Sequence, residues 1–389
     1  MKENQPYELF SINLSTILKG MMIFTLSLLS LFSFAGMLTS LTYNYRLSSH
    51  SVNEAAENVP GGALYYLYTM ENKLFAAHAP EGARPPSLSE VAFRYATNVR
   101  FQDPRSFLGR EIPGFSIYDG EILVAGEGTD YTNMPIESEP PDRVLDKGND
   151  VAVKPAKEIP REKDSPPPSL TTGGKKRVYL YFTHTRESYL PHLQGVSSAD
   201  SAHHSALNVT KVGEMVRKAL EAKGIGTTVD KTDIVAKLDQ SGRKYSQSYQ
   251  ESRALVASAQ SNHRDLQYFI DIHRDSQRKE VTTASINGKD YAKVVFVVGG
   301  EHANYEKNVK LATQWHNLLE KKYKGLSRGV ILKQGKNTNG KFNQDLSDKA
   351  MLIEFGGVDN TFEELNRTAE AFADVFADYY WQAEAVQAD

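Results

Sequence analysis

The sequence predicts an α/β fold for residues 177–389, with a mostly parallel sheet flanked by helices. Two observations lead to this fold class. Short apolar runs alternate with longer segments whose apolar residues recur at helical spacing. Three of the apolar runs also lead into His or Glu, as strands do when their carboxyl ends form the ligand-binding edge of such a sheet. Ahead of this domain, the sequence predicts an N-terminal transmembrane helix and a smaller α/β region.

Each element of the C-terminal domain follows from a local pattern. The segment 209–223 is amphipathic and ends before Gly224, a residue type that commonly terminates helices. The strand segments are short and rich in Val, Ile, Phe and Tyr. We expect strands at 178–182, 227–229, 266–272, 293–298 and 350–355, and helices at 209–223, 249–261, 304–323 and 362–380.

A transmembrane anchor is predicted near the N-terminus. Residues 20–41 contain no charged residue and consist largely of Met, Ile, Phe and Leu. Their length matches the ~20 residues that a helix needs to cross a bilayer. A cleaved signal peptide is the alternative, but its apolar core usually has only about 7–15 residues. We therefore expect a single-pass membrane protein whose chain from residue 47 onward lies outside the cytoplasm.

The N-terminal half is predicted to have three parts. Residues 1–46 hold the tail and the anchor, and residues 47–135 form a small extracytoplasmic domain with a strand-like stretch at 115–125. Residues 136–176 hold seven of the sixteen prolines and no aromatic residue. Such a segment buries too little apolar surface to offset the entropy of ordering it. We interpret it as an extended linker to the catalytic domain at 177–389.

Composition excludes several kinds of site. The chain has no cysteine, which excludes disulfides, Cys-ligated zinc and thiol nucleophiles. Its formal net charge is −3, so no overall basic field indicates nucleic acid as a partner. A metal site in this chain would therefore use histidines and carboxylates.

Suitable residues of these types follow three of the predicted strands. His184 and Glu187 follow the first strand, His273 follows the second, and Glu354 follows the third. A catalytic zinc takes three ligands of His or carboxylate type and leaves one position open to water. We predict that His184, Glu187 and His273 supply the ligands. Glu354 is then the carboxylate that accepts the proton of the attacking water and delivers it to the leaving amine.

The third ligand is the open point of this prediction. Glu187 could instead be a loop carboxylate that pairs with Arg186, and His203 or His204 could be a ligand or contact the substrate. Glu354 could likewise only stabilise the glycine turn that follows it.

The residues around these positions resemble the stage II sporulation protein P family. The resemblance lies in residues 181–191, 208–213, 269–276 and 352–357, and the predicted anchor and linker fit as well. Residues 177–389 are similar to zinc-dependent N-acetylmuramoyl-L-alanine amidases. This resemblance implies that two histidines, His184 and His273, bind the metal and that Glu354 is catalytic. The third ligand does not carry over, because such amidases have a glutamate where this chain has His203 and His204.

The family resemblance also implies a biological setting. It implies a peptidoglycan hydrolase that cuts the amide between muramic acid and the stem peptide, with endopeptidase activity on cross-links. The enzyme would degrade the septal wall during engulfment, with its catalytic domain in the septal intermembrane space. The implied partners are sporulation protein D, a transglycosylase, and the membrane protein M.

Two other functions compete with this interpretation. A metallocarboxypeptidase-like hydrolase would also use a His-x-x-Glu motif with a distant His and a distant Glu. A membrane-tethered scaffold that binds the wall without activity is the non-enzymatic alternative.

Overall fold

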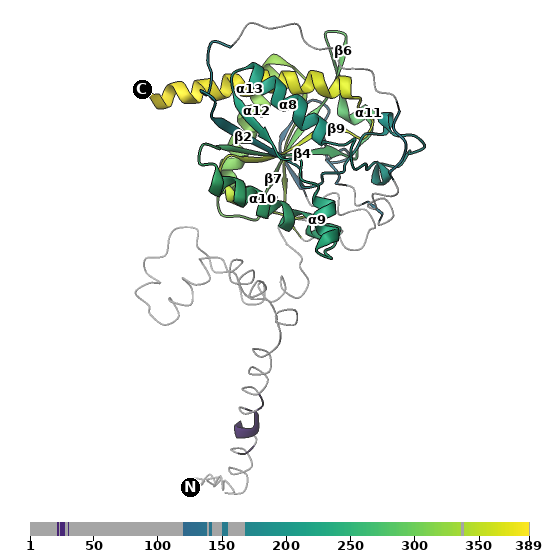
Figure 1. The fold of residues 1–389 in the computed structure, drawn as a ribbon, viewed down its shortest axis with the longest axis vertical. Helices are drawn as coiled ribbons and strands as arrows, with labels where there is room; N and C mark the ends of the chain where they lie inside the picture. Colours follow the sequence, from purple (N-terminus) through teal and green to yellow (C-terminus); the bar gives the residue numbers. More distant parts are fainter. Residues whose placement is uncertain are drawn as a thin grey trace, which may run out of the picture. The chain divides into compact units, whose positions relative to one another are not determined.

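The computed structural model describes residues 22, 24–27, 30, 120–137, 140–141, 150–154, 168–335 and 338–388 (Figure 1). The chain divides into two units, Met1–Val99 and Arg100–Asp389. In the first unit the described residues are helical and lie between positions 22 and 30. Most of the predicted anchor and the region 47–119 lie outside the described residues. Among the described residues, no helix has the length and apolar character needed to span a membrane.

The second unit is built on a seven-stranded sheet with the strand order β1-β8-β7-β9-β4-β2-β3. Four of its neighbouring pairs are parallel, and only β7–β9 and β1–β8 are antiparallel. The predicted α/β class with a mostly parallel sheet is therefore confirmed. The strands are β1 (Gly120–Ala125), β2 (Lys176–Tyr181), β3 (Gly226–Val229), β4 (Tyr268–Asp275), β7 (Val294–Gly299), β8 (Ser327–Lys333) and β9 (Ala350–Gly357), and a separate hairpin pairs β5 (Thr283–Ile286) with β6 (Lys289–Ala292).

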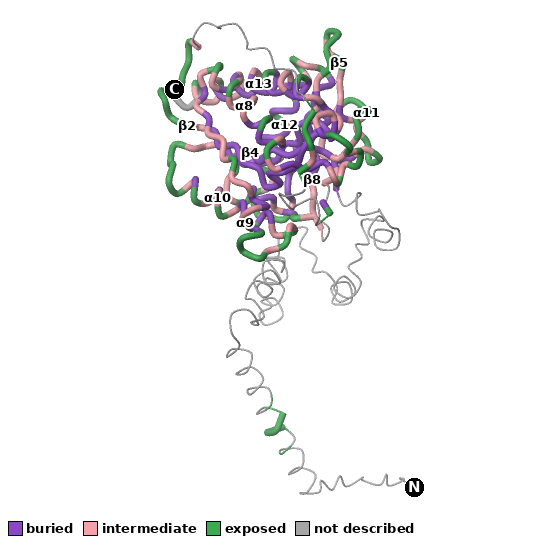
Figure 2. Tube along the Cα trace, turned by 45° about the vertical axis from the view of Figure 1, so that its right-hand side comes forward, coloured by how far each residue is buried: buried purple, intermediate pink, exposed green. Residues whose placement is uncertain are grey.

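Helices cover both faces of the sheet (Figure 1). Three long helices pack together on one face, and the other face is covered by α10 with α9 beside it. The sheet between them is buried along most of its length (Figure 2). The first layer contains α8 (Thr210–Ala222), α12 (Tyr305–Lys322) and α13 (Phe362–Ala388); the second contains α9 (Ile234–Gln240) and α10 (Ser248–Asn262); shorter elements are α11 (Lys279–Thr282), η4 (Leu190–His192), η5 (Ala199–Ser201), η6 (Tyr245–Gln247) and η7 (Gln344–Leu346).

The two faces of each strand differ because side chains alternate along it. On β4, Tyr268, Ile270 and Ile272 belong to the main core beneath α8, α12 and α13. Phe269 packs in the smaller core beneath α10. Asp271 and His273 have the same parity as Phe269, so they point to the α10 face. Asp271 and His273 thus lie on the face that has the thinner apolar layer.

Strand β1 extends this sheet from a part of the chain that precedes the predicted linker. It pairs antiparallel with β8, a strand that the sequence analysis missed. Gly329 of β8 has a φ of 111°, and a Cβ at this position would collide with the carbonyl oxygen of Val124. Glycine therefore permits the close approach of the two strands. The domain boundaries at residues 135 and 176 stay predictions.

Candidate metal centre

The three strands that lead into the candidate residues are neighbours. β9, β4 and β2 are adjacent and parallel, so their carboxyl ends meet at one edge of the sheet. His184 and Glu187 lie in the loop after β2, as expected. His273 and Glu354 lie within β4 and β9 rather than after them, because the pairing of these strands continues to Asp275 and Gly357. His273 and Glu354 are direct partners in this register.

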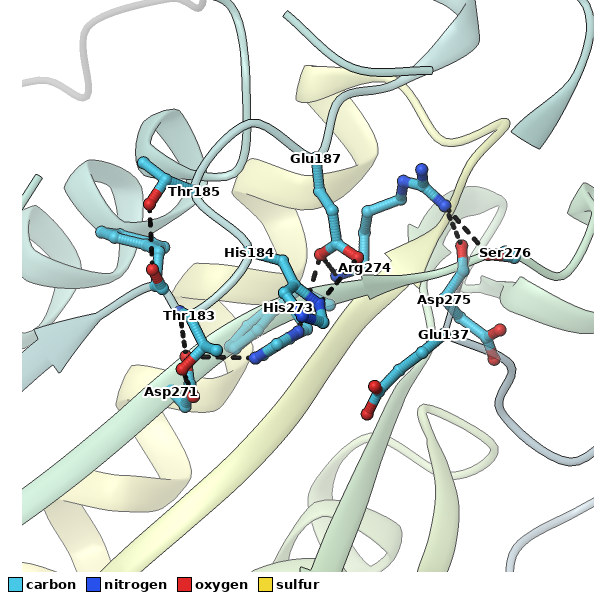
Figure 3. A network of polar contacts seen from close by, with 12 residues as sticks. Glu137, Thr183, His184, Thr185, Glu187, Asp271, His273, Arg274, Asp275 and Ser276 are labelled. Carbon is cyan, nitrogen blue, oxygen red and sulfur yellow. Dashed lines mark hydrogen bonds and ion pairs between the residues drawn. The ribbon is translucent and has the colours of Figure 1, made fainter. Parts of the chain in front are cut away.

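The structure brings His184, Glu187 and His273 together, with one ligand atom from each lying within 4.8 Å of the other two. Figure 3 shows the three side chains pointing toward one another. Nδ1 of His184 is 3.7 Å from Oε1 of Glu187, and Nδ1 of His273 is 3.7 Å from Oε2. Among the described residues, neither Nδ1 atom nor Oε1 has a hydrogen-bond partner. Zinc ligands at about 2.0–2.2 Å from the metal lie roughly 3.3–3.6 Å apart, so this donor set fits a metal ion.

Asp271 orients His273. Its Oδ1 lies 3.1 Å from Nε2 of His273 and accepts a hydrogen bond of 2.8 Å from the backbone N–H of Thr183. Burial by itself would lower the pKa of His273, but the charge and hydrogen bonding of Asp271 outweigh this and raise it to about 10. A carboxylate at Nε2 leaves Nδ1 directed at the metal position, which is a common arrangement for ligating histidines.

Glu187 is an ionised carboxylate in a buried position. Its Oε2 accepts a hydrogen bond of 3.2 Å from the backbone N–H of Arg274. Burial would raise its pKa, but the neighbouring His184, His273 and Arg274 lower it to about 2. The charge that a metal ligand needs is therefore present at any ordinary pH.

Glu354 has the opposite electrostatic setting. Its side chain is buried, and among the described residues its Oε2 has no hydrogen-bond partner. Burial raises the pKa of Glu354 to about 8, against the lowering effect of His273 and with the support of Glu187, Asp275 and Glu137. A buried carboxyl with a pKa near neutrality, beside a metal site, is suited to take up and release a proton.

Tyr249 of α10 forms one wall of the site. Its ring is stacked on that of His273 at 6.2 Å between centroids and meets that of His184 edge-on at 5.5 Å. Its hydroxyl is 3.2 Å from Oε1 of Glu137, which therefore accepts a hydrogen bond.

Glu137 belongs to a segment that we call the strap, residues 133–137. The backbone N–H of Ile136 donates to Oδ1 of Asp275 at 3.0 Å, and the carbonyl of Ile136 accepts from Ser276 at 3.1 Å. Arg328 forms a buried ion pair with Asp275 and also donates to the carbonyl of Asn133. The strap is thus fixed to the end of β4, next to the candidate metal ligands.

His203 and His204, the two alternatives for the third metal ligand, lie in different environments. His204 accepts hydrogen bonds of 3.0 Å at Nδ1 from the backbone N–H groups of Ala206 and Leu207, so this nitrogen serves its own loop. His203 is buried, and burial lowers its pKa to about 3. Neither belongs to the group of three ligand atoms, in which Glu187 is the third residue.

Sequence reasoning missed three residues of the site. Asp271 had a usable signal, because it precedes His273 by two positions and must share its face of the strand. Tyr249 was placed on a helix, but nothing in the sequence indicated that its ring would meet both histidines. Glu137 lies at the start of the proline-rich stretch, where no local pattern pointed to the site.

The two sequence comparisons agree with each other on the family. The sequence model of the stage II sporulation protein P family matches residues 102–377. Stage II sporulation protein P of Bacillus subtilis (strain 168) is 49% identical over 381 residues, which cover 97% of this chain and 95% of that protein. Among solved structures, Cwp6 from Clostridium difficile matches with a TM-score of 0.31 and 16% identity, over 53% of this chain and 30% of that one.

Proposed function

This chain belongs to the stage II sporulation protein P family, and from that premise we propose that it is a zinc-dependent peptidoglycan hydrolase of sporulation. The proposed reaction is that of an N-acetylmuramoyl-L-alanine amidase, which hydrolyses the amide between muramic acid and the stem peptide. Endopeptidase cleavage of cross-links is the proposed second activity. One observation carries the proposal: three buried ligand atoms without hydrogen-bond partners lie beside the buried carboxyl of Glu354.

The donor set supports zinc as the metal. Two imidazoles and one carboxylate form a ligand set found in hydrolytic zinc sites, and they leave one coordination position for water. His184, Glu187 and His273 would hold the ion, which when bound supplies a Lewis acid for the scissile carbonyl and for water.

The protein's own residues account for the movement of the proton. Glu354 is the direct strand partner of His273 and therefore lies next to the ligand set. It accepts the proton of the attacking water and passes it to the nitrogen of the breaking C–N bond. Asp271 meanwhile holds His273 in the tautomer and orientation that the ligand role requires.

The proposed setting is the septal wall during engulfment. The apolar segment at 20–41 would anchor the chain in the cell membrane and place the catalytic domain in the septal intermembrane space. The proposed partners there are sporulation protein D, a transglycosylase, and the membrane protein M.

Product analysis tests the proposed reaction. Digestion of purified peptidoglycan should release peptides that begin with L-alanine, and a chelator should stop the reaction until zinc is added back. Release of C-terminal amino acids would instead show a carboxypeptidase. Wall binding without any product would show a scaffold.

Glu354→Gln tests the assigned base. The amide cannot accept the water proton, and proton transfer by a positioned group contributes about 10²–10⁴-fold in rate. We expect turnover to fall by that factor while one zinc per chain remains bound. Loss of zinc in this variant would show that Glu354 is a ligand, and retained turnover would show that the base lies elsewhere.

A further inference from the structure

His203 lies in a short chain segment that pairs with the loop carrying Glu187. The backbone N–H of Ser188 donates to the carbonyl of Ala202, and that of His204 donates to the carbonyl of Arg186, both at 2.8 Å. Glu187 and His203 are direct partners in this antiparallel bridge. Side chains that are directly opposite in an antiparallel pair lie on the same face. His203 therefore shares the face of Glu187, the face of the metal ligands.

The neighbouring residues lie on the other face of this pair. Arg186 forms an ion pair with Asp233 at 3.0 Å. Nδ1 of His204 lies 4.0 Å from Oδ2 of Asp150 and accepts a hydrogen bond from the backbone N–H of Ala206 in the same loop. The alternation thus separates the two adjacent histidines, and only His203 is turned toward the site.

The imidazole of His203 is buried, with the backbone of Asp200 as a minor electrostatic neighbour. The residue is only 3% exposed, and among the described residues neither of its ring nitrogens has a hydrogen-bond partner. The centroid of its ring is 6.5 Å from the centroid of the Tyr245 ring. The Tyr245 ring is in turn stacked on the ring of His184, with 5.0 Å between centroids. Buried polar atoms without partners are rare in folded proteins, and here both lie beside the candidate metal centre.

Arg274 fixes the position of this segment. Its guanidinium donates to the carbonyl of Ser188 at 2.9 Å, to that of Ala199 at 3.0 Å and to that of Ala202 at 3.3 Å. Its backbone N–H donates to Glu187. One buried arginine therefore holds the ligand loop and the His203 segment together at the end of β4, which is the rigidity that a binding residue needs.

His203 and Glu354 approach the ligand set from different parts of the fold. Glu354 lies on β9 beside His273, whereas His203 lies beside Glu187 in the loop after β2. His203 does not belong to the three-residue ligand group, so the group keeps its open position for water.

We propose that His203 binds the substrate by donating a hydrogen bond to the carbonyl oxygen of the scissile amide, where negative charge develops during hydrolysis. This inference rests on the proposed amidase function. A preorganised donor at such a position contributes about 10²–10³-fold in rate. The other ring nitrogen remains an acceptor for an N–H of the same peptide.

The test compares His203→Leu with His204→Leu in the full chain, with a muramoyl peptide as the substrate. For His203→Leu we expect kcat to fall about 10²–10³-fold, with one zinc per chain and an unchanged or higher melting temperature. Removing an unpartnered buried polar group relieves its desolvation cost, so stability should not suffer. His204→Leu should show the reverse, a lower melting temperature with normal kcat per folded molecule. His203→Gln, whose amide can donate, should restore part of the rate.

The outcomes separate the two proposals. If the unaltered chain releases no peptide from muramic acid, the amidase function fails whatever the variants do. If the unaltered chain is active and His203→Leu keeps its kcat, His203 has no role in the reaction. If His203→Leu loses zinc, His203 is a metal ligand and the inference is overturned.

Discussion

The two sides of the end of β4 are built in different ways. On one side the loop after β2 brings His184 and Glu187 to His273, and several of their polar atoms have no hydrogen-bond partner among the described residues. On the other side lies the strap, where the carboxylate of Asp275 accepts two backbone N–H groups and pairs with Arg328. The two sides begin only two residues apart, at His273 and Asp275.

This difference separates reactivity from stability. Buried polar atoms without partners cost stability unless a bound ligand forms hydrogen bonds or metal bonds with them. The ligand side is therefore arranged to bind a metal and a substrate. Removing one partner of a fully paired buried carboxylate destabilises the fold, because it leaves a buried charge without compensation. We therefore expect substitutions on the ligand side to change function with little unfolding, and substitutions that break the Asp275–Arg328 pair to destabilise the chain.

The largest effect is expected for His184→Ala. Removing one of three metal ligands should abolish both zinc binding and hydrolysis, because the two remaining ligands cannot hold the ion in a catalytic geometry. Metal analysis of the purified chain and digestion of peptidoglycan measure the two quantities. The exposed His263 at the end of α10 provides the control, since His263→Ala should change neither. One zinc per chain in His184→Ala would contradict the ligand assignment.

Arg328→Met should have the next largest effect, on stability. It leaves Asp275 buried without its ion partner, which costs about 3–5 kcal/mol of unfolding free energy. Arg253→Met is the matched control, because the Arg253–Asp345 pair is largely at the surface and should contribute no more than about 1 kcal/mol. Chemical denaturation gives both values. Equal losses in the two variants would remove the distinction between the sides.

Asp271→Asn should have a smaller, purely functional effect. The amide no longer provides the charge that orients His273, and loss of such a partner reduces metal affinity about 10–100-fold. Competition with a chelator of known affinity measures the change. An unchanged zinc affinity would show that the strand pairing and the ring of Tyr249 orient His273 without Asp271.

The smallest effect is expected for Glu137→Gln. Glu137 is the strap residue that contacts Tyr249 on the ligand side. Its oxygen only accepts a hydrogen bond from the hydroxyl of Tyr249, and the amide oxygen of glutamine can still accept that bond. We expect kcat/KM to change by less than about tenfold while zinc content and melting temperature stay the same. A change of more than about a hundredfold would make Glu137 part of the catalytic machinery.

Local patterns in the sequence were enough to predict the sheet class and to identify His184, Glu187, His273 and Glu354 as the candidate residues. His184, His273 and Glu354 follow apolar runs, and the carboxyl ends of parallel strands meet at one edge, so their proximity followed from strand direction alone. The same reasoning applied to the alternation on β4 would have added Asp271. These features depend on residues close together in the chain and on general rules of sheet geometry.

Only the tertiary structure decided the remaining features. The choice of Glu187 over its neighbouring histidines depends on the pairing of residues 186–188 with 202–204, which local pattern does not specify. The place of β8, the antiparallel direction of β7 against β9, and the strap all depend on contacts between distant segments. Arg328 and Asn133, for example, are 195 residues apart. Such contacts form only because the packed core holds both segments in place. The local sequence around a charged residue does not indicate which distant residue it will contact.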